Sequence, residues 1–264
     1  VDRSRGLGDV YKRQGVDQKE QLKSIFPNVH VLTLSATPIP RTLQMAFSGI
    51  RDLSLINTPP KNRMPIETNV IEFDQGTIRS AIIREIKRDG QVFFVVPRIK
   101  DIRAIEEFLN NFLPEVKYMV ATGKTSNKEL EKTISAFYYG ELDLLVSTNI
   151  VGSGLDVQRA NTIFIYRAEL FGLSQLYQIR GRVGRSNKRA FAYLITKKNA
   201  ALTESARKRL DLIKELNSLV SGFTLSSQDL EMRGSGNILG EEQTGQVNEI
   251  GVSLYQEMLQ KTIN

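Results

Sequence analysis

The chain has 264 residues, 41% of them hydrophobic and 25% charged, as in ordinary soluble globular proteins. With no cysteine and a single histidine, His30, the sequence excludes a disulfide framework, a thiolate metal site and histidine-based metal or triad chemistry. The 36 Lys and Arg against 29 Asp and Glu leave a net charge of +7, which predicts a polyanionic partner, with nucleic acid the leading candidate. No membrane span or secretory signal is visible, so we expect a cytoplasmic protein without a membrane partner.

The first quarter of the chain contains one strong strand signal. Residues Val1–Gln14 are rich in glycine and charge without a hydrophobic period, so they are predicted to be a disordered leader. Val29–Ser35 is typical of a buried strand, which the prolines of Ala36–Pro40 end sharply. The Pro, Lys and Asn residues of Thr58–Pro65 predict a linker and a domain boundary.

After this linker, strand-like and helix-like segments alternate. This order predicts an α/β fold with a mostly parallel sheet that has helices on both faces. The predicted strands are Ile66–Phe73, Gln91–Val96, Val116–Ala121, Leu142–Ser147, Thr162–Tyr166 and Ala190–Ile195. The predicted helices between them are Gly76–Arg88, Asp101–Phe112 and Ser126–Tyr138, the last with a capping box from Ser126 to Glu129. A long helix at Thr203–Val220, a glycine-rich stretch and a closing helix at Val252–Gln260 complete the prediction.

The segment Gln175–Arg185 combines three arginines, two glycines and the glutamine Gln178. Arginine offers a rigid, permanently charged fork for phosphoryl oxygens, so the segment predicts a site for a γ-phosphate. Gly181 and Gly184 are expected to let the backbone turn tightly enough for the three guanidinium groups to converge. The alternative interpretation is a solvated basic helix face, which two glycines would weaken.

A second phosphate-like motif does not meet the requirements of a phosphate-binding loop. Gly123-Lys124-Thr125 follows a predicted strand and precedes a predicted helix, but Tyr118 occupies the position of the required first glycine. Gly123 is therefore expected to supply a turn between strand and helix. Lys124 is expected to contact a nucleic-acid phosphate.

Three short motifs resemble superfamily 2 helicases in order and spacing. Ser35-Ala-Thr37, Thr148–Asp156 and Gln178–Arg185 are similar to motifs III, V and VI of that superfamily. Two longer runs, Ser35–Leu43 and Asp229–Gly240, resemble the branch that RecG and the transcription-repair coupling factors form.

Two further runs, Glu241–Gly245 and Gly251–Leu259, favour the coupling-factor side of this branch. The resemblance covers residues 15–264 and implies a two-lobed RecA-like motor with ATP between the lobes. In these terms residues 15–57 resemble the end of the first lobe, 65–197 the second lobe and 198–264 a helical translocation module. The motifs that bind most of the ATP and Mg²⁺ would lie in first-lobe segments that this chain lacks, so the chain is expected to be a C-terminal fragment, inactive alone.

The resemblance also implies roles for individual residues. Arg182 and Arg185 would reach the β- and γ-phosphates while Gln178 orients water or a neighbouring arginine, and no metal ligand is expected. Three residues would lie close to the nucleotide: Gly154, Asp156 and Gly181. Seven would couple the nucleotide state to DNA or contact it: Ser35, Thr37, Arg98, Lys124, Thr148, Arg233 and Gln243. The alternative for Ser35 and Thr37 is a pair of strand-end caps, and for Arg233 a glycine-rich surface loop.

Three functions remain open at this point. The resemblance implies an ATP-dependent double-stranded DNA translocase that displaces stalled RNA polymerase and brings in a nucleotide excision repair protein, with both proteins binding through regions absent here. The first alternative is a RecG-like fork-remodelling helicase. The second, of another class, is a non-catalytic nucleic-acid-binding module, because the chain contains no complete phosphate-binding loop.

Overall fold

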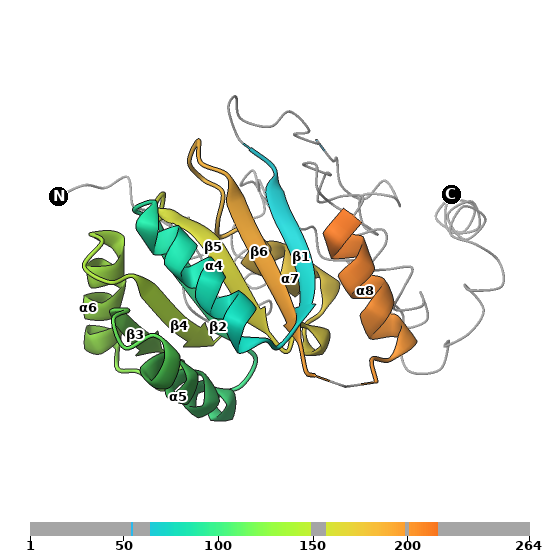
Figure 1. Cartoon of the computed structure of the whole chain (residues 1–264), viewed down its shortest axis with the longest axis horizontal. Helices are drawn as coiled ribbons and strands as arrows, with labels where there is room; N and C mark the ends of the chain where they lie inside the picture. Colours follow the sequence, from blue (N-terminus) through green and yellow to red (C-terminus); the bar gives the residue numbers. More distant parts are fainter. Residues whose placement is uncertain (1–53, 55–63, 149–156, 199–200, 216–264) are drawn as a thin grey trace, which may run out of the picture. The chain divides into compact units, whose positions relative to one another are not determined.

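The structure is a computed structural model that describes Ser54 and residues 64–148, 157–198 and 201–215 (Figure 1). The expected leader, the first-lobe segment apart from Ser54, and most of the translocation module lie outside the described residues. The predicted second lobe, in contrast, is described almost throughout. Among the described helices, none is long and apolar enough to cross a membrane.

The described residues form a six-stranded sheet in which every pair of neighbouring strands is parallel. The strand order is β1-β6-β5-β2-β4-β3. The strands are β1 Ile66–Glu72, β2 Gln91–Val96, β3 Tyr118–Ala121, β4 Leu144–Thr148, β5 Ala160–Tyr166 and β6 Ala190–Thr196. The predicted α/β class and the parallel sheet are thus confirmed.

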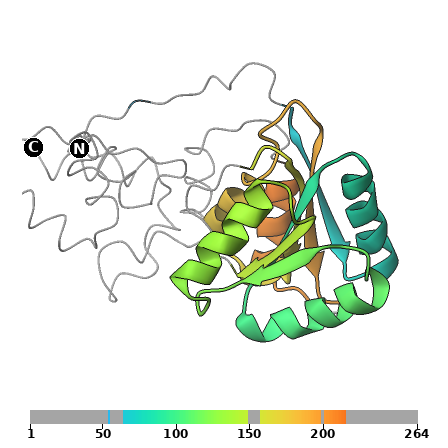
Figure 2. The same cartoon turned by 90° about the vertical axis from the view of Figure 1, so that its left-hand side faces the viewer.

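Helices cover both faces of this sheet, as predicted. One face packs against α4 (Gln75–Lys87) and α5 (Ile102–Phe112), and the other against α6 (Asn127–Tyr138), α7 (Leu173–Arg180) and α8 (Glu204–Glu215). Figure 2 shows α4 and α6 on opposite sides of the sheet. Strand β2 is buried along its whole length, so its alternate residues enter two separate cores: Phe93 faces the α6 side, and Phe94 the α4 side.

Helix α7 was not predicted. Its buried residues Leu173, Leu176 and Ile179 recur at helical spacing, which is a signal that the glycines and arginines just after them obscured. The helix begins after Gly172, whose backbone N–H donates to the side-chain Oε1 of Gln175 at 2.9 Å. Residues 175–180 of the segment Gln175–Arg185 are therefore helical, and the turn is confined to the residues after them.

Two other helix starts follow from their sequences. The Ser126 hydroxyl accepts a hydrogen bond from the Glu129 N–H at 3.3 Å, as the capping box predicts, and itself donates to the Glu129 carboxylate at 2.8 Å. Asp74 caps α4 by accepting from the Thr77 N–H at 2.7 Å. Two short 3-10 helices, η1 (Ile99–Asp101) and η2 (Ala168–Leu170), follow β2 and β5.

Candidate functional site: an arginine turn and the opposite sheet edge

The arginine turn, residues 181–185, begins where α7 ends. Gly181 caps the helix, and the Arg182 and Val183 N–H groups donate to the carbonyls of Ile179 and Arg180 at 3.1 and 3.4 Å. The turn leaves Arg182 and Arg185 partly exposed, and Gln178 is exposed on the last turn of α7. Two of the predicted nucleotide residues, Arg182 and Arg185, are therefore brought together in one turn, and Gln178 lies on the helix that leads into it, just before Gly181.

Only one of the two glycines has the conformation that requires glycine. Gly184 has a φ of +72°, and a Cβ atom there would lie 3.0 Å from Cγ1 of Ile66 and 3.2 Å from Cβ of Ala190. Gly181 has a φ of −68°, which any residue adopts, and an added Cβ would meet its nearest neighbouring atom at 3.4 Å. The prediction that both glycines are needed for the turn is correct for Gly184 and wrong for Gly181.

Two positive charges share the arginine turn. Burial first, and then the charge of Arg185, lower the pKa of Arg182 from its ordinary value. The Arg185 Nε donates to the Gly181 carbonyl at 3.4 Å, whereas the described residues include no hydrogen-bond or ion-pair partner for the Arg182 guanidinium. Such a pair fits a polyanionic ligand, because a phosphate would relieve the repulsion between the two guanidinium groups.

Arg180 does not join this pair, contrary to the prediction that three guanidinium groups converge. Its side chain is only 6% exposed, and Nη1 donates to the Ile213 carbonyl of α8 at 3.0 Å and to Thr68 Oγ1 of β1 at 3.5 Å. Its guanidinium also lies over the Tyr177 ring, 5.3 Å from the centroid. The physical reason is that α7 continues to Arg180 and directs this side chain toward the sheet, on the face that α7 buries.

Three of the residues predicted to contact DNA lie at the carboxyl end of the sheet. Thr148 ends β4 and pairs with Val96, the last residue of β2, so Arg98 follows two residues beyond that pair. Lys124 follows β3, whose last residue Ala121 pairs with Ser147. Because β2, β4 and β3 are neighbours and parallel, Arg98, Lys124 and Thr148 follow or end adjacent strands at one edge.

The local geometry differs among these three residues. Arg98 and Lys124 are exposed, whereas Thr148 is only 6% exposed and its Oγ1 has no hydrogen-bond partner among the described residues. Lys124 lies in a compact turn in which its N–H donates to Thr122 Oγ1 at 3.1 Å and the Thr122 N–H donates to Thr125 Oγ1 at 3.0 Å. This turn connects a strand to a helix, as predicted for Gly123.

The arginine turn and the DNA-contact candidates occupy opposite edges of the sheet. Gly184 packs against Ile66 and Ala190, the first residues of β1 and β6, while Thr148 is the last residue of β4. Thr148 and Val157 flank residues 149–156, and Val157 lies just before the start of β5. The chain between them therefore joins one edge to the other.

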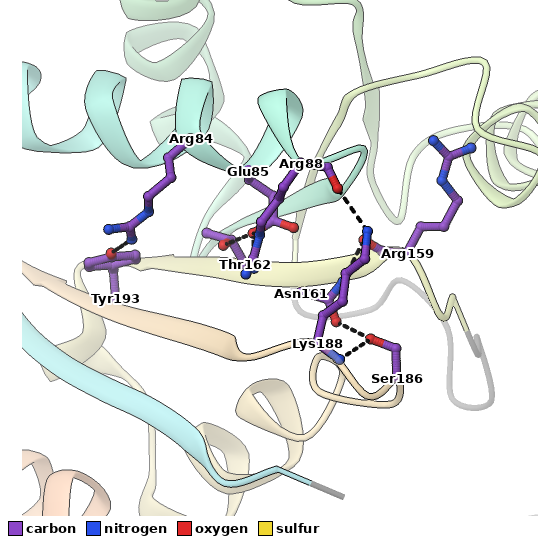
Figure 3. Close-up of polar contacts among 9 residues, drawn as sticks. All are labelled: Arg84, Glu85, Arg88, Arg159, Asn161, Thr162, Ser186, Lys188 and Tyr193. Atoms are coloured by element: carbon purple, nitrogen blue, oxygen red, sulfur yellow. Dashed lines mark hydrogen bonds and ion pairs between the residues drawn. The ribbon is translucent and has the colours of Figure 1, made fainter. Parts of the chain in front are cut away.

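Six predicted site residues lie outside the described residues: Ser35, Thr37, Gly154, Asp156, Arg233 and Gln243. No group of three or more acidic or histidine side chains that could hold a metal ion occurs in the described ranges. Sequence reasoning also missed a polar network at the amino end of β5, which joins Glu85, Asn161 and Ser186 to their neighbours (Figure 3). These partners are 25 and 77 residues apart in sequence, so no local signal could have paired them.

Comparison with known proteins identifies the domain and the relatives. Residues 77–187 match the helicase conserved C-terminal domain. The transcription-repair-coupling factor of Rickettsia bellii (strain RML369-C) is 50% identical over 255 residues, which is 97% of this chain and 23% of that protein. The predicted resemblance to transcription-repair-coupling factors is confirmed. The transcription-repair-coupling factor of Bacillus subtilis (strain 168) is 48% identical over 255 residues, which is 97% of this chain and 22% of that protein.

A solved structure of RecG bound to a three-way DNA junction is also similar. The two chains are 28% identical and superpose with a TM-score of 0.64. The match covers 94% of this chain and 39% of the RecG chain. The fold is thus that of a RecA-like C-terminal lobe of the helicase family. The chain spans less than a quarter of the length of these coupling factors.

Proposed function

We propose that this chain contributes the second motor lobe of an ATP-dependent double-stranded DNA translocase. The observation that carries the proposal is the arginine turn, which holds Arg182 and Arg185 close enough for their charges to interact and keeps both partly exposed. A pair of guanidinium groups in this state is suited to stabilise charge that develops on a phosphoryl group during transfer. ATP supplies the phosphoanhydride bond whose hydrolysis drives the motor.

Each residue of the arginine turn has a separate task in this proposal. Arg185 and Arg182 stabilise negative charge on the γ- and β-phosphates, and exposed Gln178 orients the attacking water or the neighbouring guanidinium. Gly181 allows the backbone to approach the nucleotide, and Gly154 and Asp156 contact it from the preceding motif. In this proposal, ATP and Mg²⁺ are bound mainly by first-lobe motifs, and the arginine turn completes the site from the second lobe.

DNA binding is assigned to the opposite edge of the sheet. Arg98 and Lys124 offer exposed positive charge, and the hydroxyl of Thr148, which has no hydrogen-bond partner among the described residues, can donate to a phosphate oxygen. Phosphate contacts of this kind do not read sequence, which suits a motor that steps along any template. Residues 149–156 join the two edges and would carry the nucleotide state to the DNA. Ser35 and Thr37 would relay it between lobes.

Beyond the lobe, Arg233 and Gln243 would convert closure of the nucleotide cleft into a step on duplex DNA. The biological role that we propose is the displacement of stalled RNA polymerase and its coupling to nucleotide excision repair. Identity of 46–50% to coupling factors over 97% of the chain supports this role. RNA polymerase and the repair protein would bind regions that this chain does not contain, and the motor would act in the cytoplasm.

One alternative has specific support. The structural similarity to RecG on a three-way DNA junction favours a fork-remodelling helicase as the second candidate. The two are separated by giving the purified full-length gene product a polymerase stalled on duplex DNA and, separately, a model fork. ATP-dependent release of the polymerase supports the coupling function, whereas branch migration without release supports the alternative. Failure of both, together with intact DNA binding, would favour a non-catalytic binding module.

A further inference from the structure

The segment that follows the arginine turn is exposed but held by side-chain hydrogen bonds. Ser186 Oγ donates to Asn161 Oδ1 at 2.8 Å, and the Lys188 N–H donates to Ser186 Oγ at 3.3 Å. The Lys188 Nζ donates to the carbonyl of Arg88, at the end of α4, at 2.8 Å. Figure 3 shows Ser186 and Lys188 converging on the start of β5. The exit from the arginine turn is therefore fixed at more than one point.

Asn161 is the inner partner in this arrangement. It is the second residue of β5, it is only 1% exposed, and its Nδ2 donates to the Arg159 carbonyl at 3.1 Å. That bond orients the amide, because only the nitrogen of an amide can donate, and it leaves Oδ1 directed at Ser186. A buried amide with both ends satisfied resists rotation, so Ser186 is held by a fixed acceptor.

The next residue of β5 anchors the strand on its other face. Thr162 Oγ1 donates to the Glu85 carboxylate of α4, and Glu85 is 1% exposed and ion-paired with Arg88. The register between β2 and β5 shifts here, so that Asn161 lies between the paired residues Ala160 and Thr162. By their contacts, Asn161 and Thr162 connect the amino end of β5 to different parts of the molecule. Asn161 holds the exit of the arginine turn, and Thr162 holds α4.

Arg185 thus lies between two constrained residues. On one side Gly184 packs against Ile66 and Ala190 with no space for a side chain, and on the other Ser186 is bonded to Asn161. The backbone of Arg185 has little freedom while both constraints hold. Loss of the Asn161 bond removes the constraint nearest its carbonyl group.

We propose that Asn161 is a positioning residue that acts through Ser186 to aim the Arg185 guanidinium at the transferring phosphoryl group; this rests on the proposed function. Misplacement of a catalytic group by about 1 Å can cost about 10²-fold in rate. Asn161→Ala leaves the arginine in place but frees its neighbour, so we expect turnover to fall about tenfold. KM for ATP should change less than about twofold, because the interaction forms mainly in the transition state.

The test uses the full-length gene product and measures DNA-stimulated ATP turnover, KM for ATP and melting temperature. Asn161→Ala and Ser186→Ala should each lower kcat about tenfold, whereas Ser186→Thr keeps the hydroxyl and should retain kcat. The matched control is Thr162→Val, which removes the bond on the opposite face. It should lower the melting temperature while kcat stays within about twofold.

A double-mutant comparison locates the effect at Arg185. In an Arg185→Lys background, which keeps a charge but loses the planar fork, adding Asn161→Ala should lower kcat less than about twofold further. A further tenfold loss in that background would overturn the proposal, as would an equal kcat loss in Thr162→Val. If Arg185→Lys itself leaves turnover unchanged, the proposed function fails at the arginine turn. If it lowers turnover while Asn161→Ala does not, only the positioning role fails.

Discussion

The guanidinium group of Arg180 donates a hydrogen bond through Nη1 to the backbone carbonyl of Ile213 at 3.0 Å. This contact joins the end of α7, just before the arginine turn, to the helix α8 that leads toward the C-terminal residues. Arg180 and Arg182 are two residues apart, yet one is buried in a structural contact and the other is partly exposed. Only the second is available to a ligand.

Arg180→Ala is predicted to destabilise the fold. It leaves the Ile213 carbonyl and the Thr68 hydroxyl without their buried donor, at a cost of about 2–3 kcal/mol in the free energy of unfolding. Hydrogen exchange in α8 should accelerate, because that helix loses its bond to α7. Arg182→Ala is the matched control, with an expected change below about 1 kcal/mol by urea unfolding of the chain. Equal effects of the two substitutions would contradict the structural assignment.

Gly184→Ala is predicted to destabilise the arginine turn. The positive φ and the short distances to Ile66 and Ala190 leave no relaxed conformation for a methyl group, so we expect a loss of about 1–3 kcal/mol. Gly181→Ala, three residues earlier, should change stability by less than about 0.5 kcal/mol, since its φ is ordinary. Urea unfolding of both variants checks the difference, and a larger loss for Gly181→Ala would contradict the geometry.

Glu85→Ala is predicted to be among the most damaging substitutions in α4. It removes the carboxylate that Arg88 and Thr162 share in a buried site, and breaking such a pair costs about 3 kcal/mol or more. Glu107→Ala in α5 breaks an exposed pair with Arg103 and should cost less than about 0.5 kcal/mol. Thermal unfolding compares the two, and a tolerated Glu85→Ala would show that the Glu85 network adds little to stability.

The cap of α4 should make its contribution to stability depend on pH. Hydrogen bonds from the side chain and the backbone of Thr77 lower the pKa of Asp74 below its ordinary value of 3.8. A lowered pKa means that the carboxylate stabilises the fold above the unfolded-state pKa, and that this contribution is lost as pH falls through the folded-state pKa. Asp74→Asn keeps the cap without the charge, so its melting temperature should fall less than wild type between about pH 5 and pH 2. Identical pH profiles would contradict this.

Most of the sheet was predictable from sequence because β2, β3, β4 and β6 each contain a short run of apolar residues between more polar segments. Gln91–Val96 is an example: its six residues are buried, and its predicted and observed bounds agree. The predicted strand begins at Val116, two residues before the observed start of β3. Val116 is buried, but it lies in a turn in which its N–H donates to the Leu113 carbonyl, and burial alone does not distinguish a turn from a strand.

The site was predictable only in part. Residue type and spacing identified Arg182 and Arg185, but the direction of Arg180 depends on α7, which the glycine-rich segment concealed. The positioning of Ser186 by Asn161 and of Thr162 by Glu85 depends on contacts between distant segments of the chain. Such contacts follow from strand order and helix placement, which a single sequence does not specify at the level of individual side chains.

The most direct test of the central claim, that the two edges of the sheet serve ATP and DNA separately, compares Arg185→Ala with Lys124→Ala in the full-length gene product. ATP turnover at saturating DNA and duplex affinity as a function of salt are measured for both. Arg185→Ala should lower kcat by at least about 10³-fold while duplex affinity stays nearly constant. Lys124→Ala should keep kcat but weaken DNA binding. The slope of log affinity against log salt concentration should become smaller by about one. Turnover within about twofold of wild type in Arg185→Ala, or loss of DNA affinity in that variant alone, would contradict the separation.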